Sequence, residues 1–238
     1  MTNIKNLKIK IFADGASIDD MFSLNRKNYI SGFTTNPSLM KQARITDYKT
    51  FAIQILKKIN SKSVSFEVTS DSFNEMEKQA LEIKKWSKNI FIKIPFTNSK
   101  GKKTISLIKR LTDRGLKLNI TSVFTYQQAK EVLNVLNKNS EAYISIFAGR
   151  IADTGRDPAE IIKKCVTASK KFKKVSILWA SCRQIYSIFE AEKAGCHIIT
   201  VPHSILKKFS IIGKNLKEYS VETARDFYLD SKDISFKF

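Results

Sequence analysis

Cysteine, histidine, proline and glycine are all scarce in this sequence of 238 residues, with 3, 2, 4 and 8 copies respectively. The cysteines Cys165, Cys182 and Cys196 are odd in number and show no metal-ligand spacing, which argues against a disulfide framework and a zinc site. No stretch rich in proline and glycine divides the chain, so we expect one domain over residues 1–238. No apolar run approaches the roughly 20 residues of a membrane span. These absences predict a cytoplasmic protein that binds no metal and no membrane.

Positive charge, by contrast, is abundant, because 42 Lys and Arg against 22 Asp and Glu give a net charge of +20. Lysine supplies 34 of these 42 residues and arginine 8, and the lysines are spread over almost every predicted helix. Spread lysine indicates solvated helix faces, whereas nucleic-acid sites favour clustered arginine and aromatic residues. We therefore expect no nucleic-acid partner.

Short apolar runs alternate with longer amphipathic stretches along the whole chain, which predicts strands alternating with helices. The predicted strands are residues 8–13, 32–35, 64–69, 90–96, 118–121, 143–147, 175–180 and 197–201. Helix starts are marked by Ser17 three residues before Asp20, and by Thr125 three residues before Gln128. Eight such units without a glycine-rich dinucleotide turn favour an α/β fold of the closed (β/α)8 TIM-barrel type. A further C-terminal helix, at residues 220–230, is expected to pack on the barrel or on a neighbouring subunit.

The lysine within the run Ile-Phe-Ile-Lys-Ile-Pro at residues 90–95 is the most unusual feature of the sequence. Strand alternation places Lys93 on the same face as Phe91 and Pro95, toward the barrel interior. Desolvation there disfavours the ammonium form and leaves a nucleophilic amine that can form a Schiff base with a carbonyl. Taken alone, such a lysine is also compatible with an edge strand or with a side chain that reaches out to solvent.

Other polar residues stand where predicted strands end, and in a barrel of this type these ends build the active site. Two carboxylates are among them: Asp14 follows the first strand and Glu67 lies within the third. Two carboxylates near one amine suit carbon–carbon bond cleavage, which needs a base for a hydroxyl proton and groups that position water. Either carboxylate could instead cap a helix or a turn. The fifth and sixth strands add Asn119, Thr121 and Ser145.

Arginines follow the two late strands of the predicted barrel, at Arg150 and Arg183, with Ser181 beside the second. Forked, charge-assisted hydrogen bonds from such residues are suited to a phosphate group. A salt bridge at the barrel rim is the structural alternative for each arginine. His197 and His203 flank the last strand without partner spacing for metal or triad chemistry, so we interpret both as structural.

Several segments carry a resemblance to a known family. They read GFTTNPSL at 32–39, IKIP at 92–95, LNIT at 118–121, IFAGRI at 146–151 and ASCR at 180–183. In this order they resemble the transaldolases, in particular the short subfamily that also includes fructose-6-phosphate aldolase. The resemblance implies a class I aldolase barrel without metal or organic cofactor. Its substrates would be sugar phosphates of the non-oxidative pentose phosphate pathway.

The resemblance also implies a role for each matching residue. Lys93 would form the imine, Asp14 would act as acid and base, and Glu67 with Thr121 would hold the water used in imine formation. Asn36, Asn119 and Ser145 would bind the dihydroxyacetone portion of the ketose. The implied substrate-binding set as a whole is Thr34, Asn36, Asn119, Ser145, Phe147, Arg150, Ser181 and Arg183.

Two positions favour transaldolase over aldolase within this resemblance. Fructose-6-phosphate aldolases tend to carry Gln where Glu67 stands and Tyr where Phe147 stands. Cys182, where the family often has Phe, departs from the pattern and concerns acceptor preference more than reaction type. The alternatives are an aldolase that releases free dihydroxyacetone and, in another class, an inactive basic barrel that binds nucleic acid. By analogy with the short subfamily we also expect a homo-oligomer, a pentamer or decamer.

Overall fold

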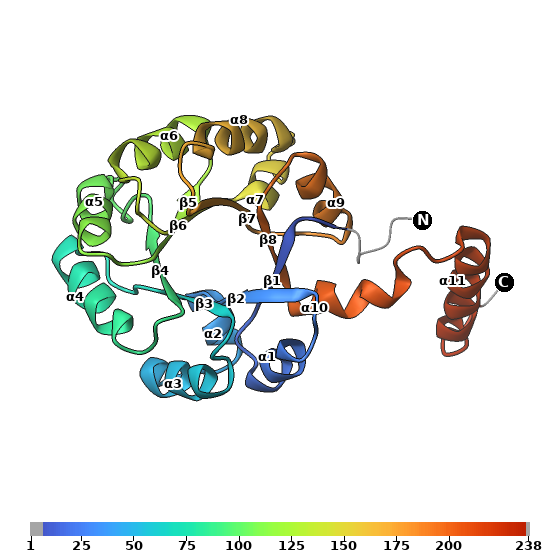
Figure 1. The fold of residues 1–238 in the computed structure, drawn as a ribbon. Helices are drawn as coiled ribbons and strands as arrows, with labels where there is room; N and C mark the ends of the chain where they lie inside the picture. Colours follow the sequence, from blue (N-terminus) through green and yellow to red (C-terminus); the bar gives the residue numbers. More distant parts are fainter. Residues whose placement is uncertain (1–6, 237–238) are drawn as a thin grey trace.

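The structure, a computed structural model, describes residues 7–236 and contains a closed barrel of eight parallel strands in sequential order, β1 to β8 (Figure 1). The strands are β1 Lys10–Asp14, β2 Ile30–Thr34, β3 Ser63–Glu67, β4 Ile90–Pro95, β5 Leu118–Val123, β6 Ala142–Ile146, β7 Val175–Trp179 and β8 Ile198–Pro202. Each lies within two residues of the boundaries predicted from sequence. The predicted (β/α)8 barrel is confirmed.

Most helices follow the strands and form the outer layer of the barrel (Figure 1). The helices are α1 Ile18–Asn25, α2 Pro37–Gln42, α3 Tyr48–Lys58, α4 Phe73–Lys84, α5 Ile105–Asp113, α6 Tyr126–Val135, α7 Ala148–Ala152, α8 Ala159–Ser169, α9 Tyr186–Lys193, α10 His203–Leu206 and α11 Leu216–Ser231, with a 3-10 turn at Lys207–Ile211. The predicted helix starts are confirmed. The Ser17 hydroxyl caps α1, and Thr125 forms a capping box with Gln128 at the start of α6.

The barrel interior is apolar at one end and polar at the other. Phe91 stacks on Tyr143 with ring centroids 3.8 Å apart, and Phe12 meets the edge of the same Tyr143 ring at 5.7 Å. These rings close the barrel where the strands begin. Lys93 lies two residues further along β4 on the face of Phe91, so it is the next inward side chain toward the carboxyl ends of the strands. The aromatic layer thus forms the floor of a polar chamber.

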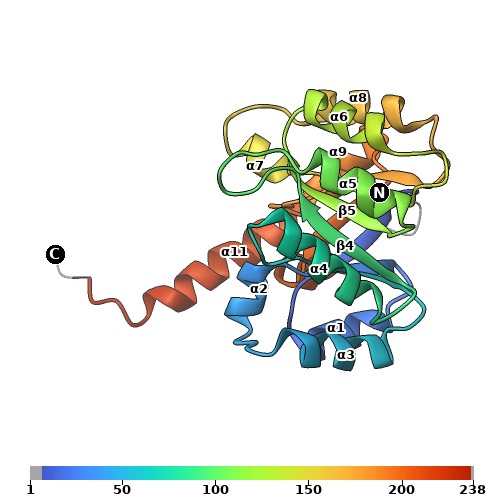
Figure 2. The same ribbon diagram turned by 90° about the vertical axis from the view of Figure 1, so that its left-hand side faces the viewer.

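Helix α11 extends away from the barrel (Figure 2). It is longer than the predicted 220–230, and none of its residues is buried. Leu216 and Phe227 are 81% and 70% exposed, an unusual exposure for large apolar side chains. Packing of this helix on a neighbouring subunit stays a prediction. Within residues 7–236, no helix combines the length and the apolar character needed to cross a membrane.

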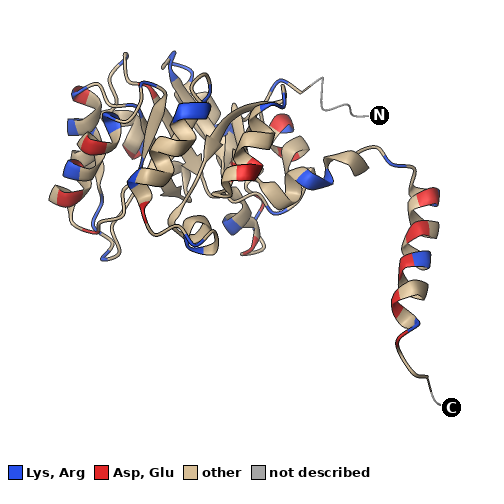
Figure 3. Ribbon diagram, turned by 90° about the horizontal axis from the view of Figure 1, so that it is seen from below, with Lys and Arg blue, Asp and Glu red and all other residues tan. Residues whose placement is uncertain are grey.

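Lys and Arg are interspersed with Asp and Glu around the barrel and along α11 (Figure 3). Many of them form exposed ion pairs, such as Lys49 with Glu82 and Arg110 with Glu77. Pairs of this kind between neighbouring helices contribute little to stability, and they keep the helix faces solvated.

Candidate active site at the carboxyl ends of the strands

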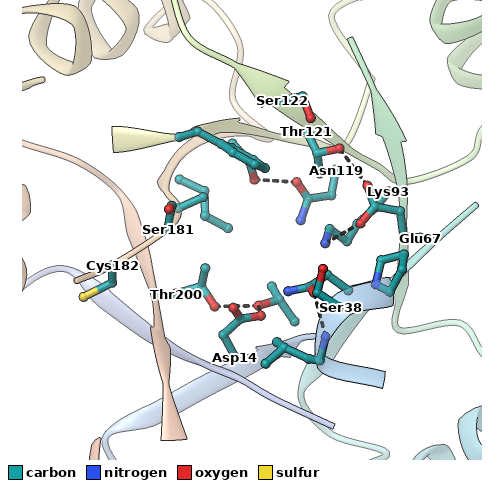
Figure 4. Close-up of a pocket in the computed structure, with 18 of the residues that line it drawn as sticks. Asp14, Ser38, Glu67, Lys93, Asn119, Thr121, Ser122, Ser181, Cys182 and Thr200 are labelled. Carbon is teal, nitrogen blue, oxygen red and sulfur yellow. Dashed lines mark hydrogen bonds and ion pairs between the residues drawn. The ribbon is translucent and has the colours of Figure 1, made fainter. Parts of the chain in front are cut away.

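A cavity of about 550 Å³ opens at the carboxyl ends of the barrel strands (Figure 4). All twelve site residues predicted from the sequence line it, namely Asp14, Thr34, Asn36, Glu67, Lys93, Asn119, Thr121, Ser145, Phe147, Arg150, Ser181 and Arg183. The structure therefore brings the whole predicted set into one chamber. The roles of these residues in a reaction stay predictions.

Lys93 lies on the wall of this chamber and is 7% exposed. Its Nζ atom is 2.9 Å from the Oε2 atom of Glu67 and donates a 2.7 Å hydrogen bond to the backbone carbonyl of Thr35. The register of β3 and β4 pairs Glu67 directly with Lys93, which is why the two side chains meet. The Lys93 amine is therefore held beside a carboxylate that can take its proton.

Glu67 is held at both its side chain and its backbone. Its Oε1 atom accepts a 3.0 Å hydrogen bond from the Thr121 hydroxyl, and its carbonyl oxygen accepts one of 2.8 Å from the Tyr48 hydroxyl. Burial raises the pKa of Tyr48 well above its ordinary value, so that hydroxyl stays a donor. The carboxylate thus bridges Lys93 and Thr121 in a fixed orientation, an arrangement that can hold a water molecule next to the amine.

Asp14 lies across the chamber from Glu67 (Figure 4). Its Oδ1 atom accepts a 2.6 Å hydrogen bond from the Thr34 hydroxyl, which in turn lies 2.6 Å from the hydroxyl of Thr200. Burial raises the pKa of the Asp14 carboxyl, against the opposing effects of the Lys93 charge and the Thr34 hydrogen bond, and the charge of Glu67 raises it further. A carboxyl with a raised pKa is suited to taking and returning a proton near neutral pH.

A second polar chain crosses the chamber from β6 to β3. The Ser145 hydroxyl donates to Asn119 Oδ1 at 2.6 Å, and Asn119 Nδ2 donates to the Ser65 hydroxyl at 3.2 Å. All three side chains are buried. In this arrangement the amide oxygen of Asn119 faces Ser145 and its nitrogen faces Ser65.

Asn36 both caps a helix and lines the cavity. Its Oδ1 atom accepts a 3.0 Å hydrogen bond from the backbone amide of Leu39 and caps α2, while the residue also lines the cavity. The capping bond fixes the side chain at the chamber edge.

The arginines occupy the rim of the chamber. Arg183 forms an ion pair of 2.6 Å with Asp153, and both side chains are half exposed, so the rim salt bridge considered as its alternative is present. The Arg150 guanidinium lies 6.0 Å from the centre of the Phe147 ring. Gly149 packs so closely on the next loop that a Cβ there would overlap the carbonyl oxygen of Ser181. That close approach sets α7, and with it Arg150, against the Ser181 segment.

Sequence reasoning missed Thr200 and Ser65, although each carried a readable signal. Thr200 is a polar residue inside the apolar run of β8, and Ser65 shares the inward face of β3 with Glu67.

The two histidines line no part of the cavity. His197 accepts a hydrogen bond from the backbone of Ile177, and His203 packs on Gly15. Among residues 7–236, no group of three or more His, Cys, Asp or Glu side chains is arranged to hold a metal ion.

Comparison with known proteins identifies the family of this chain. The model of the transaldolase/fructose-6-phosphate aldolase family matches residues 11–237. A probable transaldolase of Dehalococcoides mccartyi is 34% identical over 199 residues, covering 83% of this chain and 88% of the relative. One of Thermoanaerobacter sp. is 36% identical over 203 residues, with the same coverage.

A solved structure shares the fold. The crystal structure of dihydrodipicolinate synthase from Rhodopseudomonas palustris superposes with a TM-score of 0.57 at 12% identity, covering 97% of this chain and 81% of that one. At this identity the likeness concerns the barrel architecture alone. The family match and the curated relatives together show that this chain belongs to the transaldolase/fructose-6-phosphate aldolase family.

Proposed function

We propose that the protein is a transaldolase, which transfers a dihydroxyacetone unit from a ketose phosphate to an aldose phosphate through a Schiff base on Lys93. The observation that carries this proposal is the buried Lys93 amine, paired with Glu67 at 2.9 Å in a chamber that also holds Asp14. An amine with two separate carboxyl groups is the set that imine formation and aldol cleavage require.

In this mechanism the first step forms the imine. The Glu67 carboxylate takes a proton from the Lys93 ammonium, and the free amine adds to the C2 carbonyl of the ketose. The resulting carbinolamine loses its hydroxyl as water when a proton is returned from the Glu67 side. The Thr121 hydroxyl, bonded to Glu67 at 3.0 Å, keeps that carboxyl oriented and can hold the departing water.

The second step breaks the carbon–carbon bond. Asp14 takes the proton of the C4 hydroxyl, and the C3–C4 bond breaks. An aldose phosphate leaves, and the electron pair of the broken bond converts the iminium into an enamine. An acceptor aldehyde then reacts with the enamine, and Asp14 returns its proton to the new hydroxyl. Hydrolysis of the imine releases the product ketose and restores the amine. The raised pKa of Asp14 favours both directions of this proton transfer.

The substrate would extend from the chamber to its rim. The chain of Ser145, Asn119 and Ser65 presents fixed polar atoms to the hydroxyl groups of the dihydroxyacetone portion. The phosphate would bind Arg150 and Arg183, with Arg183 exchanging its ion pair with Asp153 for the ligand. Retention of the enamine until an acceptor arrives would depend on how Glu67 and Phe147 control the access and position of water at the intermediate, since both residues line the chamber.

A trapping experiment tests this function. The protein is incubated with fructose 6-phosphate and reduced with borohydride, and its intact mass is measured by mass spectrometry. A Lys93→Met variant is treated in parallel. We expect a reduced dihydroxyacetone or hexose-phosphate adduct on the wild type alone. Addition of erythrose 4-phosphate or glyceraldehyde 3-phosphate should then lower the adduct and yield a new ketose phosphate. A folded wild-type protein without any adduct across a panel of ketose phosphates would refute the proposal.

We also propose that a second copy of the chain covers α11, because this helix carries exposed apolar side chains. Leu216, Phe227 and Tyr228 are each more than half exposed on a helix that the barrel does not cover. Burial of such side chains against a neighbouring subunit would remove a large apolar area from water. The expected pentamer or decamer would supply that cover.

A further inference from the structure

We propose that Thr200 is a positioning residue that acts on the acid/base carboxyl of Asp14 through the hydroxyl of Thr34. The three side chains form a continuous chain, with 2.6 Å between Thr200 and Thr34 and 2.6 Å between Thr34 and Asp14 Oδ1 (Figure 4). The assignment of a catalytic proton to Asp14 rests on the proposed function, whereas the hydroxyl chain itself does not.

The fold places these residues together through barrel closure. Strand β1 pairs with β2 on one side and with β8 on the other, and its Asp14 is the register partner of Thr34. Thr200 pairs with Phe12, two residues before Asp14, and therefore points to the same inward face of the barrel. Thr200 and Thr34 are 5% and 3% exposed. Both side chains are therefore largely shielded from bulk solvent.

The direction of the chain follows from counting protons. Thr34 has a single hydroxyl proton and donates it to the Asp14 carboxylate. The short contact between the two threonines must then be a bond donated by Thr200 to Thr34. Among the described residues no donor bonds Asp14 Oδ2, so Oδ2 is the oxygen available for the substrate proton. The chain keeps its direction whether Oδ2 is protonated or not.

The chain favours the charged form of Asp14. A hydrogen bond to a carboxylate is about twice as strong as one between neutral groups, and a donor behind it polarises and strengthens it further. Removing the Thr200 hydroxyl weakens the Thr34 bond more for the carboxylate than for the carboxylic acid. We therefore expect the Thr200→Val variant to carry Asp14 with a higher pKa than the wild type. The size of this shift is about half a unit.

Other groups that face Asp14 are common to wild type and variant. They are Lys93 on β4, Glu67 on β3 and Cys182 after β7, with the His203 ring behind Gly15. Burial raises the pKa of Cys182 to about 11, so it stays protonated in the range of interest. A difference between the two pH profiles therefore reports the hydroxyl chain.

The kinetic test measures kcat/KM for transfer between pH 4 and 9 in wild type, Thr200→Val and Thr200→Ser. We expect the acid limb of Thr200→Val to move to higher pH, so that its kcat/KM falls about threefold relative to wild type below both pKa values. Thr200→Ser keeps the hydroxyl and should retain the wild-type limb. If Thr200 contacts substrate instead, KM rises without a change in the limb. Coincident limbs in Thr200→Val and wild type overturn the inference.

A second measurement is independent of turnover. Melting temperatures of wild type and Thr200→Val are compared from pH 4 to 8, alone and in an Asp14→Asn background. A raised pKa in the folded state reduces stability as pH rises through it, so the deficit of Thr200→Val should grow with pH only where Asp14 is present. An equal deficit at every pH in both backgrounds would overturn the inference, even if the wild type proves inactive in transfer.

One control variant completes the design. Thr112→Val removes a buried threonine hydroxyl that bonds the Ile108 carbonyl on α5, outside the chamber. Its pH profile and the pH dependence of its melting temperature should match the wild type. Where Thr200→Val does not fold, Thr200→Ala takes its place in both measurements.

Discussion

Replacing Lys93 by methionine should lower stability as well as remove activity, because the substitution leaves the largely buried Glu67 carboxylate without its ion-pair partner. Lys93 is 7% exposed, and Glu67 retains 16% side-chain exposure. Removing one partner of a buried ion pair costs about 3–5 kcal/mol. Glu67 keeps its bond from Thr121, so we take the lower end, about 3 kcal/mol. For a chain of this size that corresponds to a fall in Tm of about 6–12 °C at pH 7.

The pH dependence of this loss has a definite sign. Asp14 already has a pKa raised by burial, and it also loses the opposing charge of Lys93 in the variant. A carboxyl whose pKa is raised in the folded state destabilises the fold above that pKa, and the loss is recovered as pH falls through it. The Tm deficit of Lys93→Met should therefore be larger at pH 7 than at pH 5.

Thermal unfolding followed by circular dichroism measures these effects, with two comparison variants. The double variant Lys93→Met/Glu67→Gln removes the stranded charge and keeps an acceptor for Thr121, so it should recover more than half of the lost Tm at pH 7. Lys49→Met breaks an exposed pair with Glu82 and should leave Tm nearly unchanged. If Lys93→Met melts with the wild type at both pH values, or the double variant is no more stable than the single, the ion-pair reasoning is refuted.

Three further predictions address turnover and assembly. Glu67→Gln combined with Phe147→Tyr should raise aldol cleavage relative to transfer several-fold, measured as free dihydroxyacetone against product ketose; an unchanged ratio would show that these positions do not separate the two activities. Gly149→Ala should lower both kcat/KM and Tm, because its Cβ would overlap the Ser181 carbonyl, and a variant with wild-type kinetics and melting would contradict that packing argument. Deleting residues 216–238 should reduce the assembly to smaller species in light scattering with the barrel still folded, whereas an unchanged mass would exclude α11 from the interface.

The positions of the site residues along the chain were predictable from local pattern. Lys93 stood out because a charge inside an apolar strand is rare, and Asp14 because it follows the first strand. Parallel strands in a closed barrel bring their carboxyl ends to one face, so the residues at strand ends converge without any knowledge of packing. The alternation that assigned the strands also assigned the inward face of each.

Contacts between particular side chains could not be predicted in this way. The Glu67–Lys93 pair depends on the register between β3 and β4, which a single strand does not specify. The Tyr48 hydroxyl reaches the Glu67 carbonyl from α3, an approach that depends on how the helix packs on the barrel. At the rim, the structure pairs Arg183 with Asp153. The sequence alone had left two alternatives for this arginine, a phosphate contact and a salt bridge.

The sequence by itself determined the barrel, its eight strands and the polar side chains at their ends, because periodicity and chain order are local properties. Only the tertiary structure decided which of those side chains form hydrogen bonds with one another. Thr34 and Thr200 lie 166 residues apart and meet at 2.6 Å because closure of the barrel places β1 between β2 and β8. Closure is a property of all eight strands at once, so no segment of the sequence encodes that contact alone.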